Sequence, residues 1–150
     1  MKATNNERGA GFNNCHRFNY TNLKTTGYLS TIGAANQRVI GSVPSGGAVN
    51  IVGFIQVTDP AGATDITADV GVTAADPDDF IDALDVDGLT KAAYNSGDVL
   101  TTSGDDGTLY VNNSASAVDI IMEINGTVAD LTAGEWVIIW NQIDPPTIFV

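Results

Sequence analysis

The chain has 150 residues, a mass of 15.6 kDa and a formal net charge of −12, with 43% hydrophobic but only 7% aromatic residues. This length suffices for one compact core, and so acidic a chain is expected to repel nucleic acid phosphates. The longest uncharged apolar run, Trp136 to Trp140, is far shorter than the ~20 residues that cross a bilayer. The first residues hold no apolar stretch typical of a signal peptide, so we expect synthesis in a cytoplasm without export by that route.

The charge is unevenly distributed along the sequence. Residues 1–40 carry about +4, whereas residues 41–150 carry about −16, with Lys91 their single basic residue. The basic part is interleaved with Asn, Thr and Gly, which is unlike a polybasic arm. We interpret it as a docking or pairing segment.

Taken in chain order, the sequence predicts short strands joined by turns. Residues 1–14 are polar and Gly/Asn-rich, which predicts an extended arm. Apolar alternation and β-branched residues then predict strands at Cys15–Tyr20, Gly27–Ile32, Gln37–Val43, Ala48–Thr58, Ile66–Thr73, Val99–Thr102, Thr108–Asn112, Val118–Asn125 and Glu135–Gln142. Residues 143–150 contain two prolines and end apolar, which predicts an extended tail.

One short helix is expected between these strands. Asp76 is a suitable N-cap, Pro77 suits the first helical position, and Phe80, Ile81 and Leu84 supply an apolar stripe. We expect this helix to end near Asp85 to Gly88.

Together these elements predict an all-β fold, a two-sheet β-sandwich of jelly-roll type with one short helix and extended terminal arms. The expected organisation is an N-terminal arm with weak strands over residues 1–47, a sandwich core over 48–142 and a C-terminal tail over 143–150. Within Val118–Asn125, Ile121 breaks the alternation of inward and outward residues.

Several residues invite a chemical interpretation. His16 adjoins Cys15, the single cysteine, but neighbours on an extended segment point to opposite faces, which disfavours a thiol nucleophile with its base. The acidic cluster Asp76, Asp78, Asp79, Asp82, Asp85 and Asp87 could hold a hard cation such as calcium, and its segment DVDG resembles part of a calcium loop. Helix capping and solvation explain the first three aspartates without a metal. We therefore expect no cofactor and no metal.

Two further candidates concern carbohydrates. Glu123 and Glu135 lie on different predicted strands with no spacing that predicts a facing carboxylate pair, so we expect no glycosidase activity and no enzyme. Trp136 and Trp140 share one face of a strand and could stack on sugars. Because Ile138 lies between them on that face, burial in the core is the simpler interpretation.

The stretches DVGVTAADPDDFIDALDVDGLT, AYNSGDVLTT and DIIMEINGTVADLTAGEWVIIW resemble the jelly-roll head decoration, or cement, proteins of tailed bacteriophages. This resemblance covers about residues 48–142. It implies binding to the major capsid protein on the outside of an icosahedral shell, commonly as homotrimers, where neighbouring subunits are clamped. The alternative is a receptor- or glycan-binding β-sandwich of a phage fibre or surface adhesin.

Attachment is expected to involve both ends of the chain. A basic and partly aromatic N-terminal segment can become ordered on a partner groove, and the C-terminal segment is apolar enough to need a covering surface. The residues we expect to bind a partner are Arg8, Phe12, Arg17, Phe18, Tyr20, Ile148 and Phe149.

Overall fold

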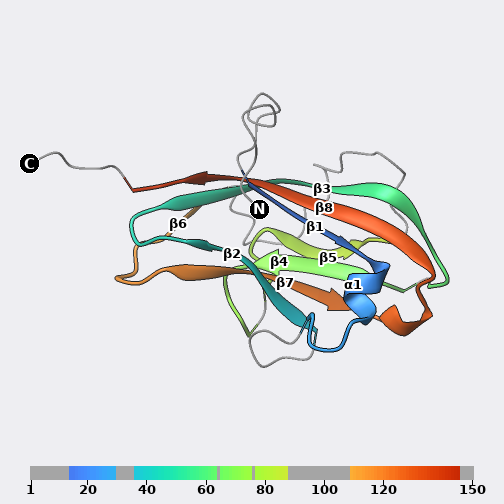
Figure 1. Ribbon diagram of the computed structural model, residues 1–150. Helices are drawn as coiled ribbons and strands as arrows, with labels where there is room; N and C mark the ends of the chain where they lie inside the picture. The colour runs from blue at the N-terminus through green and yellow to red at the C-terminus, as the bar shows by residue number, and fades with distance from the viewer. Residues whose placement is uncertain (1–13, 30–35, 64, 76, 88–108, 146–150) are drawn as a thin grey trace, which may run out of the picture.

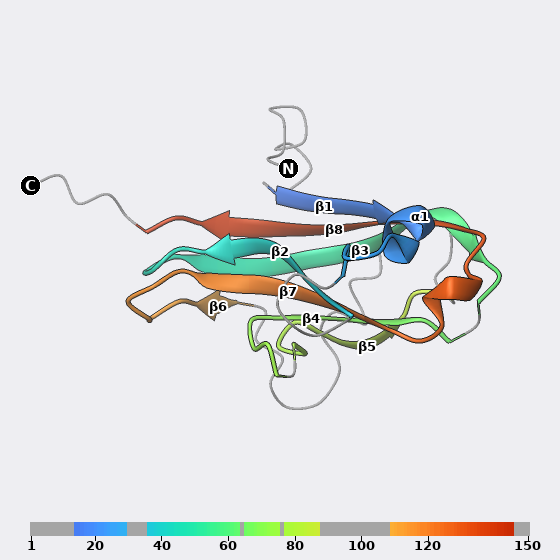
Figure 2. The same ribbon diagram turned by 60° about the horizontal axis from the view of Figure 1, so that its bottom comes forward.

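The computed structural model describes residues 14–29, 36–63, 65–75, 77–87 and 109–145. They form two antiparallel four-stranded sheets packed face to face, which confirms the predicted two-sheet sandwich (Figures 1 and 2). The strands are β1 (Asn14–Asn19), β2 (Gln37–Val43), β3 (Ala48–Ala61), β4 (Thr67–Gly71), β5 (Ile81–Asp85), β6 (Tyr110–Val111), β7 (Val118–Asn125) and β8 (Ala133–Ile143). Helix α1 covers Tyr20–Lys24, and a short 3-10 helix covers Val128–Asp130.

The strand order defines a jelly roll. Sheet A has the order β1-β8-β3-β6, and sheet B has the order β2-β7-β4-β5. The first strand therefore pairs with the last, β2 with β7, β3 with β6 and β4 with β5, all antiparallel. This is the pairing of one long hairpin folded over on itself, which is the jelly-roll arrangement.

The core lies between the two sheets and is mostly aliphatic. Inward side chains of β7 and β8 are almost completely buried, and they are Ile120, Met122, Ile124, Trp136, Ile138 and Trp140. Phe18 of β1 stacks on Trp136 with ring centroids 5.5 Å apart and meets the edge of Phe54 at 6.0 Å. Burial of both tryptophans confirms the interpretation that they are core residues.

Most strands that the structure describes agree with their predicted positions. Gln37–Val43 and Val118–Asn125 have the predicted bounds, and β3 and β8 extend beyond theirs. Ile66, Ala68 and Val70 lie buried on one face, as their alternation predicted. Residues 27–29 of one expected strand instead form a turn and a bend, and its remainder, the strand at 99–102 and the terminal segments 1–13 and 146–150 lie outside the described residues.

The predicted helix at residues 76–85 is wrong, because Ile81–Asp85 is strand β5. Its inward residues Ile81 and Leu84 pair with Val70 and Ala68, so β5 uses one residue more than β4. The irregularity lies at Ala83, whose φ is positive at 49°, as in a β-bulge. The bulge spaces two inward residues three apart, which is the spacing that we interpreted as a helical stripe.

The α-helix of the described part is instead α1, directly after β1. Asn19 is its N-cap: its side chain accepts a hydrogen bond from the Asn22 backbone N–H, and Asn22 accepts one from the Asn19 N–H. This reciprocal capping box turns the chain out of sheet A after Asn19.

The predicted boundary between arm and core at residue 47 is also wrong. β1 pairs with β8 over its whole length, β2 pairs with β7, and Phe18, Leu23 and Val43 belong to the core. Within the described residues, the sandwich therefore already includes Asn14 and extends to Ile143.

Candidate functional site

The outer face of sheet A carries more apolar side chains than a sheet face in contact with water usually does. Inward residues of β8 alternate with outward ones, which are Glu135, Val137, Ile139, Asn141 and Ile143. In sheets with one wet face the outward positions are polar, whereas strands covered on both faces are apolar throughout. β8 resembles the second kind.

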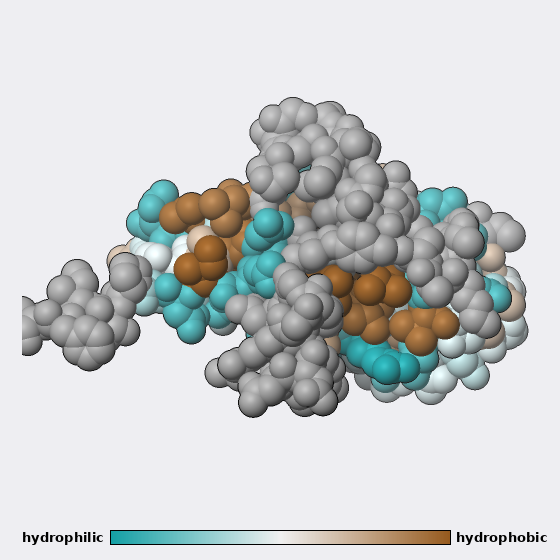
Figure 3. All heavy atoms as spheres, turned by 90° about the horizontal axis from the view of Figure 1, so that it is seen from above, coloured by the Kyte–Doolittle hydropathy of each residue, from teal (hydrophilic) through white to brown (hydrophobic). Residues whose placement is uncertain are grey.

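The neighbouring strands continue this apolar surface. Cys15 of β1 pairs with Ile139, and Ile55 and Ala48 of β3 pair with Val137 and Ile143. Cys15, Ala48 and Ile139 are buried although they are not part of the core cluster between the sheets. We call these residues the sheet A patch: Cys15, Ala48, Ile55, Val137, Ile139 and Ile143. Figure 3 views the molecule from this side, with hydrophobic residues visible toward both ends of the face.

The outer face of sheet B is different. Gln37, Glu123 and Asp69 form a polar row across β2, β7 and β4, where the Gln37 amide donates to the Glu123 carboxylate. Gln37 Nε2 also donates to the Ala74 carbonyl at 2.9 Å, so the chain between β4 and β5 crosses this face. The loop between β4 and β5 passes over the cross-strand row of Val39, Ile121 and Gly71. This covering explains why Ile121 is buried although it points outward. Sheet B thus covers part of its outer face with its own loop.

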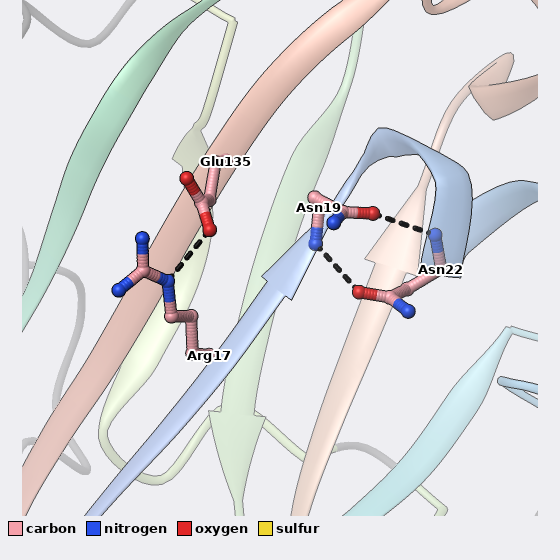
Figure 4. Close-up of polar contacts among 4 residues, drawn as sticks. All are labelled: Arg17, Asn19, Asn22 and Glu135. Atoms are coloured by element: carbon pink, nitrogen blue, oxygen red, sulfur yellow. Dashed lines mark hydrogen bonds and ion pairs between the residues drawn. The ribbon is translucent and has the colours of Figure 1, made fainter.

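An ion pair borders the sheet A patch at the end near α1. Arg17 Nε lies 2.6 Å from Glu135 Oε1, with side chains 54% and 26% exposed (Figure 4). The hydrogen bond from Arg17 holds the pKa of Glu135 below its ordinary value, and the pKa of Arg17 is raised in return. Both groups stay charged at neutral pH, so this rim presents fixed charges beside the apolar patch.

Positive charge gathers on one side of the sandwich. The described basic residues are Arg17 on β1, Lys24 on α1 and Arg38 on β2, and β1 and β2 are edge strands of the two sheets. The Arg38 guanidinium lies 4.1 Å from the centre of the Tyr28 ring and donates to the Tyr28 carbonyl oxygen. The β4–β5 part of sheet B instead carries carboxylates, so the uneven charge of the sequence becomes a charge difference between two sides of the fold.

The predicted partner-binding residues have different positions. Arg17 is exposed as expected, but Phe18 is 1% exposed in the core, so its assignment to a docking surface is wrong. The reason is the pairing of β1 with β8, which turns Phe18 toward Phe54 and Trp136. Tyr20 is half-buried against the core at the start of α1. Arg8, Phe12, Ile148 and Phe149 lie outside the described residues.

His16 and Cys15 point to opposite faces of β1. His16 faces inward, where its Nε2 lies 3.0 Å from the Tyr28 hydroxyl and its ring stacks near Phe18. Burial, together with the nearby Arg38 charge, lowers the pKa of His16 to about 4. Cys15 belongs to the outer patch, so these two side chains do not form a thiol–imidazole pair.

The aspartates around β4 and β5 accept backbone hydrogen bonds. Asp79 accepts from Val72 N at 2.6 Å and Thr73 N at 3.2 Å, and Asp87 accepts from Ile66 N at 2.9 Å. They therefore stabilise strand ends and a loop, and Asp79 does not cap the helix that we expected at its position. Within the described ranges, no group of three or more His, Cys, Asp or Glu side chains is arranged to hold a metal ion.

Glu123 and Glu135 lie on opposite sides of the molecule. Glu123 is in the outward polar row of sheet B, and Glu135 is on the outer face of sheet A. The two carboxylates therefore do not face each other across a substrate site, in agreement with the absence of a pairing signal in their spacing.

Comparisons with known proteins do not assign this chain to a family. No family model, curated protein or solved structure matches it. None of the helices in the described part of the chain is long and apolar enough to span a membrane. The fold and surface alone therefore define the class, which is a jelly-roll sandwich with one apolar outer face.

The sheet A patch was missed when the sequence was interpreted, although a signal was present. The runs AVNIVGFIQV and WVIIW are apolar at nearly every position, where a strand with one wet face would alternate. Continuous runs of this kind indicate that both faces of the strand are covered.

Proposed function

We propose that this protein is a structural subunit that attaches to the outer surface of a phage capsid, as a head decoration or cement protein. Its partner would be the major capsid protein, and its place the exterior of the virion after synthesis in the host cytoplasm. The resemblance of residues 48–142 to such proteins motivates the proposal. The observation that carries it is the apolar outer face of sheet A.

A surface of this kind is suited to binding another protein. Contiguous exposed apolar surface usually marks an interaction site, and fixed charges at its rim orient the partner. In the sheet A patch, Ile143 is 60% exposed and Val137 is half-buried beside the Arg17–Glu135 pair, whereas Cys15, Ala48 and Ile139 are already buried. A net charge of −12 opposes binding to nucleic acid or to an anionic membrane. Clamping of capsid subunits through sheet A would stabilise the shell without any catalytic step.

The alternative, a receptor- or glycan-binding sandwich, has less support. Sugar binding commonly uses aromatic rings exposed to solvent, but Trp136 and Trp140 are 0% and 3% exposed. Tyr28 is engaged with His16 and Arg38, and Tyr110 packs against Phe80.

The test uses purified, undecorated capsids and a sedimentation assay. Val137→Lys places a charge at the end of the patch beside Arg17, and Ser42→Lys places the same charge on exposed β2 of sheet B as a matched control. We expect Val137→Lys to weaken decoration by roughly tenfold or more and Ser42→Lys to leave it unchanged. Thermal melts of both variants verify that they fold, and Val137→Ser is a milder replacement should the lysine prevent folding.

Two outcomes would count against the proposal. If folded Val137→Lys decorates capsids at wild-type occupancy, sheet A is not the docking face. If the unmodified protein binds no capsid but binds a glycan array, the alternative function holds.

A further inference from the structure

The edge of β1 is the most regular strand edge in the described part of the sandwich. The edge strands of the two sheets are β1, β6, β2 and β5. β6 has only two residues, β2 has a register shift between Val39 and Gly41, and β5 pairs with β4 through the irregularity at Ala83. Short strands and bulges are devices that prevent edge-to-edge pairing. β1 instead pairs with β8 over all six of its residues without a register shift.

The cap of α1 shows which backbone groups of β1 point away from β8. In an antiparallel pair, a residue directs both its N–H and its C=O toward the partner strand or both away from it, and the two cases alternate. The Asn19 N–H donates to the Asn22 side chain at 3.0 Å, so Asn19 points away from β8 (Figure 4). Arg17 and Cys15, two and four positions earlier, therefore also direct their N–H and C=O groups to the open edge.

These edge groups are available for pairing. Within the described ranges, nothing accepts a hydrogen bond from the backbone N–H of Cys15 or Arg17 or donates one to their carbonyl oxygens on the side away from β8. Two donors and two acceptors thus alternate along one straight edge. Such a row is a template on which another extended chain can pair.

The side chains of the same two residues determine which chain fits. Both lie on the outer face of sheet A, where Cys15 pairs with Ile139 in the sheet A patch and Arg17 forms the charged rim. An added strand would place one side chain beside Cys15 and, two positions away, another beside Arg17. The first position is apolar. The second favours a carboxylate, because Arg17 uses Nε for Glu135 and retains further guanidinium N–H donors on a side chain that is 54% exposed.

The charge of this side of the sandwich also favours an acidic segment. The described basic residues, Arg17, Lys24 and Arg38, lie on the side where β1 and β2 form the edges. They attract an extended segment that carries carboxylates. The same charges disfavour β1 of a second copy, because two such edges would bring the positive charges of both copies together.

We propose that an extended segment of the partner protein adds to sheet A as a further strand beside β1. Its backbone pairs with Cys15 and Arg17, an apolar residue lies beside Cys15, and an acidic residue two positions away lies beside Arg17. In strand addition of this kind, backbone hydrogen bonds provide affinity and alternate side chains provide specificity. The inference rests on the proposed function and states how the same face holds its partner.

The first test compares Arg17→Pro with Arg17→Ala on purified, undecorated capsids. Both variants lack the guanidinium, but only proline also removes the edge N–H and places a ring where the added strand would lie. Proline is tolerated where a strand N–H faces outward, so the pairing with β8 is kept. We expect Arg17→Ala to slow association and to leave the dissociation rate nearly unchanged, whereas Arg17→Pro should dissociate roughly tenfold faster or more.

Melting curves verify that both variants fold. Should Arg17→Pro fail to fold, Cys15→Pro repeats the comparison at the other edge residue, with Cys15→Ala as its matched control. The expected difference in dissociation rate is the same, since each proline removes one edge donor.

The second test is amide hydrogen exchange, read residue by residue with mass spectrometry. In the free chain, the N–H groups of Cys15 and Arg17 should exchange rapidly, whereas those of His16 and Phe18, which face β8, should be protected. On capsids, exchange at Cys15 and Arg17 should slow by roughly tenfold or more, because the added strand accepts hydrogen bonds from them.

The outcomes separate this inference from the proposed function. Equal dissociation rates for folded Arg17→Pro and Arg17→Ala, or unchanged exchange on capsids, would overturn strand addition and leave capsid attachment intact. If the free chain at high concentration already protects these N–H groups, a second copy occupies the edge and the choice of partner is wrong. An unmodified chain that binds no capsid would contradict the proposed function, and the inference that rests on it would fall as well.

Discussion

The indole Nε1 of Trp136 donates a hydrogen bond of 3.1 Å to the carbonyl oxygen of Val86, and this bond joins the two sheets across the core. Trp136 belongs to β8 of sheet A, whereas Val86 directly follows β5 of sheet B. Trp140, four residues further along the same face, is also buried, but its indole N–H has no hydrogen-bond acceptor among the described residues. Replacing each of the two tryptophans in turn therefore gives a matched comparison that tests the contribution of this hydrogen bond.

Trp136→Phe should lower the free energy of unfolding by about 1–2 kcal/mol more than Trp140→Phe. Both replacements remove similar volume, but only the first leaves the buried Val86 carbonyl without its donor. Urea denaturation of the two variants measures the difference. Equal losses would mean that the hydrogen bond between the sheets makes no net contribution to the free energy of unfolding.

Gly126→Ala should destabilise the fold much more than Gly27→Ala. Both glycines have positive φ, 100° and 80°, but a Cβ on Gly126 would lie 2.1 Å from the Asp65 carbonyl oxygen, while a Cβ on Gly27 meets nothing within 4 Å. We expect Gly27→Ala to lower the free energy of unfolding by about 1–2 kcal/mol through backbone strain alone. Gly126→Ala should lower it by at least about 3 kcal/mol, because the steric clash adds to the strain. Thermal melts of the two variants provide the comparison, and equal shifts would show that the turn at Gly126 moves freely.

Protonation of His16 should destabilise the protein as the pH falls. Its pKa is about 4 in the folded chain and 6.5 when unfolded, so below pH 6.5 the unfolded state binds the proton more readily. The contribution of neutral His16 is fully present above pH 6.5 and is lost as the pH falls through 4, which amounts to about 3 kcal/mol. An NMR titration of this single histidine should give a midpoint near 4.

A His16→Gln variant is the control for that pH dependence. The raised pKa values of Asp69 and Asp87 act in the opposite direction, since their protonation favours the folded state at low pH. The difference between wild type and His16→Gln isolates the histidine. If the difference stays constant between pH 7 and pH 4, the ring is less buried than its contacts indicate.

Phe18→Ala should mainly lower the stability of the fold, whereas Arg17→Ala should mainly slow docking. Phe18 is packed between Phe54 and Trp136, so its truncation should cost about 3–5 kcal/mol. The exposed Arg17–Glu135 pair should contribute less than about 1 kcal/mol to stability, yet under the proposed function its loss should slow association with capsids. Stopped-flow light scattering with capsids at two salt concentrations measures that rate, and no change for Arg17→Ala would remove this rim from the docking surface.

The sequence by itself determined which strands have an inner face, because alternation is a local property of the chain. Ile66, Ala68 and Val70, or Ile120, Met122 and Ile124, can bury themselves on one side of any strand that contains them. The Asn125-Gly126 turn was equally local, since glycine accepts the positive φ that the turn requires.

Only the tertiary structure decided what covers each strand. Phe18 became a core residue because β1 pairs with β8, more than a hundred positions away, and Ile81 and Leu84 belong to a strand because a bulge at Ala83 keeps them in register with β4. The outer face of sheet A is a candidate interface for a similar reason. The period of a strand indicates where apolar side chains alternate, but whether a second layer lies over them depends on contacts between distant segments, which no local pattern encodes.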